Sequence, residues 1–243
     1  MMRCACHIAF FVVLFFCGSC HKKNLGPCTG NCQVVHFTGM AYDQTAQKPL
    51  ANVSVKVDMP RRQACTYCGD YQVASGSTKG DGTFDLSVSV DTSKVAAQYC
   101  TITVQGPSNY IVYAEPVGPG ISADAYSNAL EMPLFVDSTG RAPYKEYDFF
   151  SPVLLTVHLH RTGAIVPSEP SLSLSFIMGA TSVSAWEVVE TPTNADTSLT
   201  LHTGANVFTA INGIRYVTDS TKVNFTDSIR CVAGGNNSID ISY

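Results

Sequence analysis

Alternation of apolar and polar residues with a period of two recurs along this chain and limits what it can fold into. The run from Thr83 to Val90 places an apolar side chain at every second position, and the run from Leu50 to Val57 places Ser54 and Lys56 opposite three valines. A strand shows this period when one face of its sheet is buried and the other is wet. Because no segment has a helical period or a fixed repeat, we predict an all-β fold.

Two domains are expected from the 243 residues, since either half is long enough to bury its own core. Gly and Pro interrupt regular structure from Glu115 to Gly120, and we place the boundary there. The first domain then covers residues 34–114 and the second residues 121–243. Short alternating runs separated by turn residues predict that the second domain is also an antiparallel β-sandwich.

Two Gly-containing pairs are candidates for tight hairpins. Asp81-Gly82 lies between two alternating runs, and Gly tolerates the positive φ that such a turn requires. Asn212-Gly213 is a second candidate, although residues 206–217 can also form one bent strand.

The N-terminal segment is typical of an export signal. An apolar run from Ile8 to Phe16 follows Arg3 and is too short to span a bilayer. It ends in Phe16-Cys17-Gly18-Ser19-Cys20, which resembles the bacterial lipobox. The resemblance implies that residues 1–19 are removed and that Cys20 is lipidated, with residues 20–33 as a tether and linker. An uncleaved anchor and an ordinary secretory cut are the alternatives.

The first domain resembles a known family at two motifs. These are Lys48-Pro49-Leu50-Ala51-Asn52-Val53, preceded by Thr38-Gly39 and Asp43, and Thr78-Lys79-Gly80-Asp81-Gly82-Thr83-Phe84. Together they look like the carboxypeptidase regulatory-like domain of Bacteroidetes-type envelope proteins. The resemblance covers residues 34–112 and implies a Greek-key, transthyretin-type sandwich that serves as a non-catalytic accessory module. A Cys-bearing insert from Asp58 to Asp70 departs from the family pattern.

Six cysteines remain in the chain after Cys20. An even number of thiols in an exported protein favours disulfides. A structural zinc site is the alternative, because two closely spaced pairs supply four thiolates. The cysteines of these two pairs are the candidate disulfide or metal residues: Cys28, Cys32, Cys65 and Cys68.

The sequence does not fix how these cysteines pair. One economical arrangement joins the linker cysteines to the insert, which would stabilise each closed loop by roughly 3 kcal/mol. Cys65-Thr66-Tyr67-Cys68 also has the spacing of a thiol oxidoreductase, but that chemistry needs a helix N-terminus. Cys100 and Cys231 could join the two domains or stay free and buried.

Other residues suggest sites only weakly. His158 and His160 share one face of a strand and could hold a metal, but no third ligand is evident. Exposed aromatic residues could stack on sugars or on a partner protein, or they could fill the cores. These are Tyr67, Tyr71, Tyr110, Tyr113, Tyr126, Tyr144, Tyr147 and Trp186.

Charge and motif content narrow the function. The net charge is −4 and the 15 Lys and Arg residues form no basic run, which argues against a nucleic-acid partner. No nucleophile elbow, zinc-protease helix or phosphate-binding loop occurs, so we expect neither an enzyme nor a cofactor.

Our main prediction is a lipoprotein anchored in the outer membrane, on its periplasmic or its surface side. It would act as a binding or scaffolding module for an envelope protein or a glycan. The first alternative is a structural or adhesive surface subunit that assembles by strand addition through Ser238–Tyr243. An enzyme acting on glycans or peptides comes third.

Overall fold

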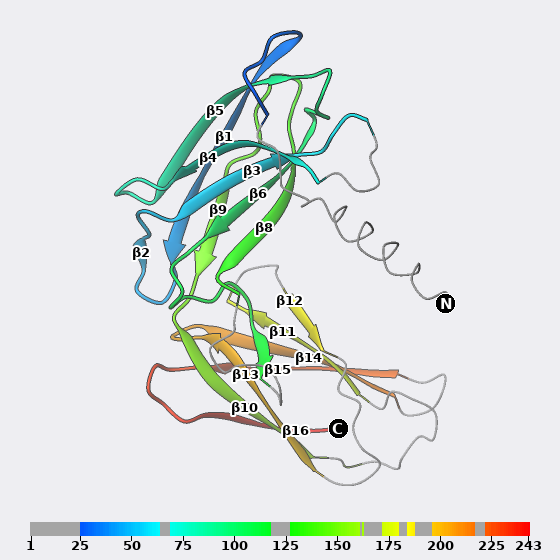
Figure 1. Cartoon of the computed structure of the whole chain (residues 1–243). Coiled ribbons are helices and arrows are strands. Elements are labelled where there is room, and N and C mark those ends of the chain that lie inside the picture. The colour runs from blue at the N-terminus through cyan, green and yellow to red at the C-terminus, as the bar shows by residue number, and fades with distance from the viewer. Residues whose placement is uncertain are drawn as a thin grey trace, which may run out of the picture.

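The computed structural model in Figure 1 describes residues 25–63, 69–117, 127–160, 162, 172–179, 184–187, 196–216 and 222–243. Over these residues all regular elements are β-strands, β1 to β16, which confirms the predicted all-β class. The described residues contain no helix long and apolar enough to cross a membrane.

Sandwich one consists of two four-stranded sheets that enclose a common core. The first sheet joins β1 (Cys32–Asp43) to β2 (Lys48–Pro49), β5 (Thr83–Asp91) and β9 (Lys145–Phe149). The second has the order β4 (Tyr71–Ser77), β3 (Ser54–Met59), β6 (Tyr99–Gln105), β8 (Ala129–Phe135). Phe37 of β1, Val55 of β3 and Ile102 of β6 are fully buried between them.

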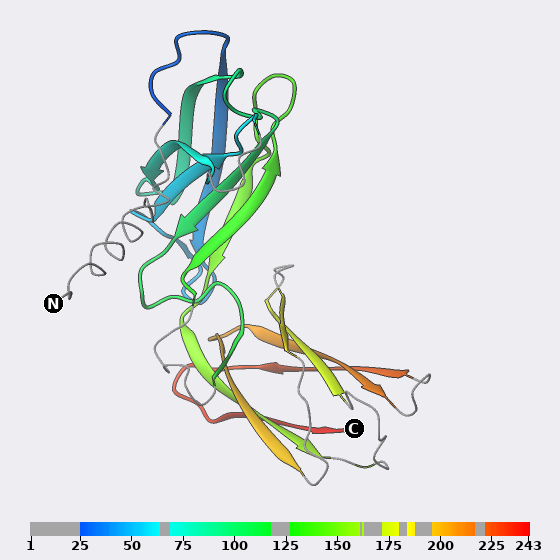
Figure 2. The ribbon, with the colours of Figure 1, turned by 45° about the vertical axis from the view of Figure 1, so that its right-hand side comes forward.

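Sandwich two is built in the same way from the rest of the chain. One sheet has the order β16 (Asn237–Ser242), β10 (Pro152–His160), β13 (Thr197–Gly204), β7 (Glu115–Val117). The other has the order β12 (Ser184–Glu187), β11 (Leu172–Met178), β14 (Phe208–Tyr216), β15 (Lys222–Arg230). Leu155, Leu174 and Ile211 lie in its core. Figure 2 shows the two sandwiches as separate lobes.

The two sandwiches repeat one topology although their sequences show no repeat. The strands β1, β3, β4, β5, β6, β8 and β9 correspond in order to β10, β11, β12, β13, β14, β15 and β16. In each sandwich the first strand lies between the fourth and the last, and the second strand lies between the third and the fifth. The chain therefore contains two copies of one fold in tandem, and the strand pairing reveals this repeat although the sequence does not.

Most strand pairs are antiparallel, as the sequence predicted, but each sandwich also contains one parallel pair. The first and last strands of each sandwich pair in parallel, β1 with β9 and β10 with β16. Alternation within a strand reports which face is buried, but it carries no information on the direction of the neighbouring strand.

The predicted boundary between residues 114 and 121 is also wrong. Strands β8 and β9 follow that point but pair with β6 and β1 of sandwich one. Only β7 crosses over, pairing antiparallel with Thr200–His202 of β13 in sandwich two. The chain passes finally into sandwich two between Phe149 and Pro152. Pro and Gly do mark a break in regular structure here, but composition does not identify the sheet that the next strand joins.

Neither predicted hairpin forms. A tight turn closes at Lys79–Thr83, with Gly82 at φ 76°, but the strands on either side of it, β4 and β5, belong to opposite sheets. Asn212-Gly213 lies inside the single strand β14. A Cβ atom at Gly213 would collide with the ring of Phe225 on β15, so this glycine makes room for an aromatic side chain instead of forming a turn.

A small third core joins the two sandwiches. Ile111, Phe150 and Met178 are buried together, with Val207 packed against them. Ile111 and Phe150 also form an isolated β-bridge with hydrogen bonds of 2.9 Å in both directions. Because Met178 and Val207 belong to sandwich two and Ile111 lies next to sandwich one, this cluster fixes the junction.

Candidate functional site

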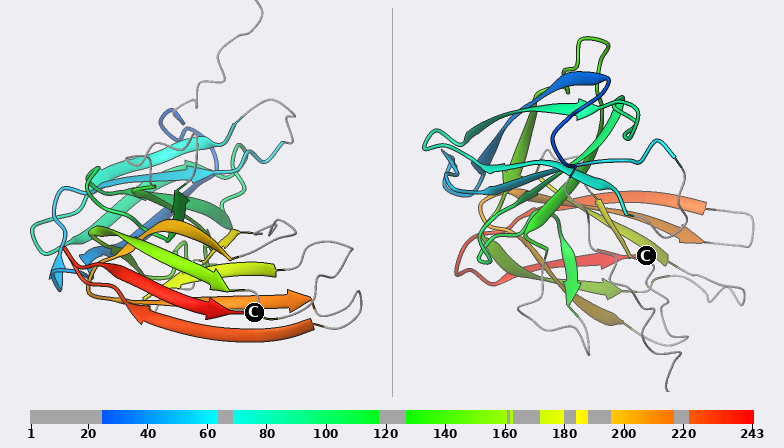
Figure 3. Two further views of the ribbon diagram at one scale, coloured as in Figure 1. Left: turned by 90° about the horizontal axis from the view of Figure 1, so that it is seen from below. Right: turned by 45° about the horizontal axis from the view of Figure 1, so that its top comes forward.

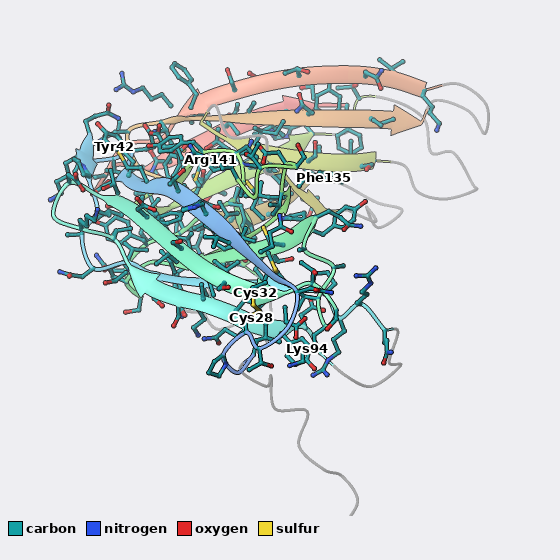
Figure 4. All side chains as sticks on the ribbon, turned by 90° about the horizontal axis from the view of Figure 1, so that it is seen from above. Cys28, Cys32, Tyr42, Lys94, Phe135 and Arg141 are labelled. Carbon is teal, nitrogen blue, oxygen red and sulfur yellow. A yellow bond between two sulfur atoms is a disulfide. The ribbon has the colours of Figure 1, made fainter. Side chains whose placement is uncertain are left out.

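The linker cysteines form a disulfide with each other. Cys28 and Cys32 are joined with a Cα–Cα distance of 5.9 Å, which Figure 4 shows near the start of β1. The expected staple between the linker and the insert is therefore wrong for these two residues, because a four-residue separation lets them meet locally. The bond also uses two of the four thiolates of the proposed zinc site. Cys65, Cys68 and Cys20 lie outside the described residues, so their predicted roles stay predictions.

The two other cysteines do not link the sandwiches. Cys100 is a free thiol in the core of sandwich one, and Cys231 is a free thiol in the core of sandwich two. Burial raises the pKa of Cys100 to about 11 and also raises the pKa of Cys231. Both thiols are therefore protonated at neutral pH and are poor nucleophiles.

His158 and His160 share the exposed face of β10, as alternation predicted. The Nδ1 atom of His158 lies 2.8 Å from the Ser198 hydroxyl. The ring of His160 lies 3.0 Å from Asp240 and 3.2 Å from Asp196. The Asp240 and Asp196 carboxylates accept hydrogen bonds from the His160 ring and raise its pKa. Within the described part of the chain, no three His, Cys, Asp or Glu residues are grouped so as to hold a metal ion.

The aromatic candidates are divided between core and surface. Tyr147 is fully buried in sandwich one, and the Tyr110 hydroxyl donates to buried Asp43 at 2.9 Å. Tyr71 is half-buried and lies under the Arg61 guanidinium, 3.9 Å from its ring centroid.

On the surface, Tyr144 is exposed, and Tyr113 is half-buried. Tyr67, Tyr126 and the side chain of Trp186 fall outside the description. Sequence reasoning missed an exposed pair, Tyr99 and Phe135, whose rings are 4.8 Å apart across β6 and β8. Tyr99 is the first residue of β6 and Phe135 is the last residue of β8, so the alternating pattern within each strand did not indicate that they meet.

The carboxylates of the turns act as local caps. Asp81, Asp91 and Asp137 each accept hydrogen bonds from the backbone and hydroxyl of a residue two positions later. These bonds lower the pKa of Asp81 and Asp91, and the Arg141 N–H followed by Thr139 lowers the pKa of Asp137. Hydrogen bonds from residues of the same turn hold each of these carboxylates in its ionised form. The three carboxylates therefore stabilise their loops and are not suited to act as general acids or bases.

The predicted C-terminal donor strand is a working part of sandwich two. β16 pairs with β10 along six residues, and Ile241 and Tyr243 are buried in the core. The Tyr243 carbonyl accepts hydrogen bonds from the backbone and hydroxyl of Thr162. Removing this segment would damage the core, so a deletion does not test strand addition here.

The neighbouring edge of sandwich two is far more open. β15 pairs with β14 along nine residues and ends its sheet. Seven of its nine residues are exposed and none is buried, which no other strand of comparable length shows in the described chain. Figure 3 shows β15 in orange at the margin of the lobe. The sequence predicted a strand here, but not that it would be an open edge. Polar residues on both faces of this segment were the pattern that indicates such an edge.

No family model matches this chain. No curated protein matches its sequence either, so the resemblance to the carboxypeptidase regulatory-like domain stays a prediction.

Comparison with solved structures returned several pilins and one other bacterial protein, all with low TM-scores. The chain is similar to the Bacillus anthracis TIE protein, with TM-score 0.31 and 10% identity over 87% of this chain and 34% of that one. This chain thus spans about a third of the length of that protein. It is also similar to the shaft pilin SpaA from Lactobacillus rhamnosus GG, with TM-score 0.31 and 11% identity over 87% of this chain and 97% of that one. The major pilin SpaD from Corynebacterium diphtheriae gives TM-score 0.30 and 9% identity, over 81% and 65% of the two chains.

Proposed function

We propose that this protein is a non-catalytic structural subunit of the bacterial cell surface that associates with a second copy of itself through the open edge of β15. The observation that carries the proposal is the exposure of this nine-residue edge. A free edge presents a row of unpaired N–H and C=O groups, and these pair readily with a strand from another chain.

The other sheet edges are less suited to this role. β8 contains Pro133 and the exposed Glu131, and both residues discourage pairing at an edge. β7 has three residues and β12 has four. β5 is as long as β15, but three of its residues are buried. Compared with β5, β7, β8 and β12, β15 is therefore the edge on which a partner strand gains most.

The charges of β15 favour one antiparallel register with a second copy. Pairing centred on Phe225 places Lys222 opposite Ser228 and Val223 opposite Asp227 of the second copy. Pairing centred on Thr226 would instead place Lys222 opposite Arg230 and bring like charges together. The first register yields a closed, two-fold symmetric pair with one continuous sheet.

The junction between the sandwiches suits a structural role. Thr45 of sandwich one donates to the Ala205 carbonyl at 3.1 Å and accepts from Ser151 N–H at 2.9 Å. Together with the buried Phe150 this gives a fixed joint and not a free linker. Lipidation at Cys20 would hold the unit at the envelope, and an intact-mass measurement of the mature protein from membranes tests it: the absence of a diacylglyceryl mass on Cys20 would contradict this part.

Substitution on the edge tests self-association. Val223 on β15 and Val232 just beyond it are similarly exposed, at 42% and 46%. The purified mature chain should show a concentration-dependent dimer by light scattering with size exclusion. Val223→Asp should be monomeric, because in the Phe225-centred register it places a second carboxylate opposite Asp227 of the other copy, and Val232→Asp should dimerise like the parent. A parent chain that stays monomeric at all concentrations, or two variants that dimerise alike, would overturn the proposal.

A further inference from the structure

A second surface feature lies at the end of sandwich one where the N-terminal linker docks. The loop after β5 and the loop after β8 enclose a pocket of about 420 Å³ there. The linker is fixed beside it, since Thr92 donates from its backbone and its hydroxyl to the Asn31 carbonyl at 3.0 and 3.1 Å. The volume falls within the range of small-molecule sites, which is roughly 300–1,000 Å³.

The floor of this pocket is apolar and firmly held. Val95, Ala97 and Val136 line it and are all buried in the core of sandwich one. The backbone closes around them, with Val136 N–H donating to the Gln98 carbonyl at 2.9 Å. A ligand that rests on this floor must therefore present an apolar face.

The rim of the pocket is rich in hydrogen-bonding groups that have no partner within the described chain. Gln33 enters from β1 and Gln98 from the segment before β6, and neither side-chain amide makes a hydrogen bond with a described residue. Ser138 adds a hydroxyl. A primary amide offers a donor and an acceptor side by side, and two adjacent hydroxyl groups match that arrangement.

The two charged groups of the rim are oriented by the backbone. The Oδ1 atom of Asp137 accepts from the Thr139 and Arg141 N–H groups at 2.8 and 2.9 Å, which leaves its Oδ2 atom as a free acceptor. Arg62 donates from Nη1 to the Thr92 carbonyl at 2.7 Å. Since one positive and one negative group line the pocket, a ligand without net charge is favoured.

From the apolar floor, the unpaired amides and the balanced charge, we infer that this pocket binds a sugar residue of a neutral glycan. The C–H face of the pyranose ring rests on Val136 and Ala97, and vicinal hydroxyls pair with Gln98 and the free oxygen of Asp137. Binding of a neutral glycan in this pocket would give the structural subunit an adhesive function. The inference adds to the proposed function but uses a different surface.

Titration of the isotope-labelled mature chain with methyl glycosides of glucose, galactose, mannose and N-acetylglucosamine tests the pocket. At least one sugar should shift the side-chain amide signals of Gln33 and Gln98 in a saturable way by NMR. Gln98→Ala and Asp137→Asn should weaken this binding at least tenfold, whereas Gln105→Ala, at the opposite end of β6, should leave it unchanged. Asp137→Asn retains the oxygen that caps the turn, so it separates ligand binding from folding.

Absence of a saturable shift with all four sugars would overturn the inference, and so would binding that Gln98→Ala and Asp137→Asn leave intact. The Val223→Asp chain should bind the sugar as the parent does. A parent chain that binds the sugar but does not dimerise would therefore contradict only the proposed assembly. A parent chain that dimerises but binds none of the sugars would contradict only the proposed pocket.

Discussion

The hydroxyl of Thr45 donates to the carbonyl of Ala205 at 3.1 Å, which joins two residues 160 positions apart across the two sandwiches. The same oxygen accepts from Ser151 N–H at 2.9 Å, and Ala205 N–H donates to the Ser151 carbonyl at 2.8 Å. One side chain thus connects the turn after β1, the chain between the sandwiches and the turn after β13.

Thr45→Val should loosen this joint. The substitution keeps the shape of the side chain but leaves the Ser151 N–H without its acceptor, so the free energy of unfolding should fall by about 1–2 kcal/mol. Thr45→Ser keeps the hydroxyl and serves as the control. Urea unfolding measures both, and equal stability of Thr45→Val and the parent would show that the bond contributes nothing.

Two tyrosines should respond in opposite directions to the same substitution. The Tyr147 hydroxyl is buried without a hydrogen-bond partner in the described structure, and burial raises its pKa. Tyr147→Phe should therefore stabilise the protein by about 1 kcal/mol, because the unpaired group is removed.

Tyr110→Phe is the matched comparison. The Tyr110 hydroxyl donates to Asp43, which is 2% exposed, and its removal leaves a buried carboxylate short of a donor. We expect a loss of about 1.5–3 kcal/mol. Thermal unfolding of both variants checks the pair, and a Tyr147→Phe variant that is less stable than Tyr110→Phe would contradict the prediction.

Gly39→Ala should weaken sandwich one. A Cβ atom at Gly39 would lie 2.6 Å from the Lys145 carbonyl oxygen and 2.6 Å from the Phe84 ring. The backbone of β9 cannot move away without breaking its parallel pairing with β1, so we expect a cost of about 1–3 kcal/mol. Gly80→Ala is the control, since nothing lies within 4 Å of its Cβ position. Chemical denaturation that gives both variants the same midpoint would rule out this close packing.

The pair of carboxylates at His160 should make the edge of sandwich two sensitive to pH. The His160 ring donates hydrogen bonds to Asp240, which has the larger effect, and to Asp196, and these bonds raise the pKa of His160 above its ordinary value of 6.5. A raised pKa means that the folded state binds the proton more tightly. This contribution to stability is therefore complete below pH 6.5, and it is lost as the pH rises through the folded pKa.

NMR titration of the His160 ring measures this effect. Its midpoint should lie above the value found in the urea-unfolded chain, and Asp240→Asn should lower it. A His160 midpoint at or below the unfolded value would contradict the arrangement of the two carboxylates.

Much of the fold follows from sequence because alternation is a local property. Phe84 and Leu86, or Val55 and Val57, alternate with polar neighbours, and each strand built from them was expected for that reason. The even number of cysteines after Cys20 predicted disulfides, but not that Cys28 and Cys32 would bond to each other. His158 and His160 were placed correctly on one face, whereas Asp196 and Asp240, which contact His160, come from strands or loops far away in the chain.

The sequence by itself determined the all-β class, the positions of most strands and the residues on their buried faces, since these depend on neighbours one and two positions apart. The tertiary structure alone decided which strands pair. It carried β7 into sandwich two, returned β8 and β9 to sandwich one, set the parallel pairs and left β15 open. Pairing depends on the free energy of the whole packed core, and distant segments contribute to that energy in ways that no local pattern records.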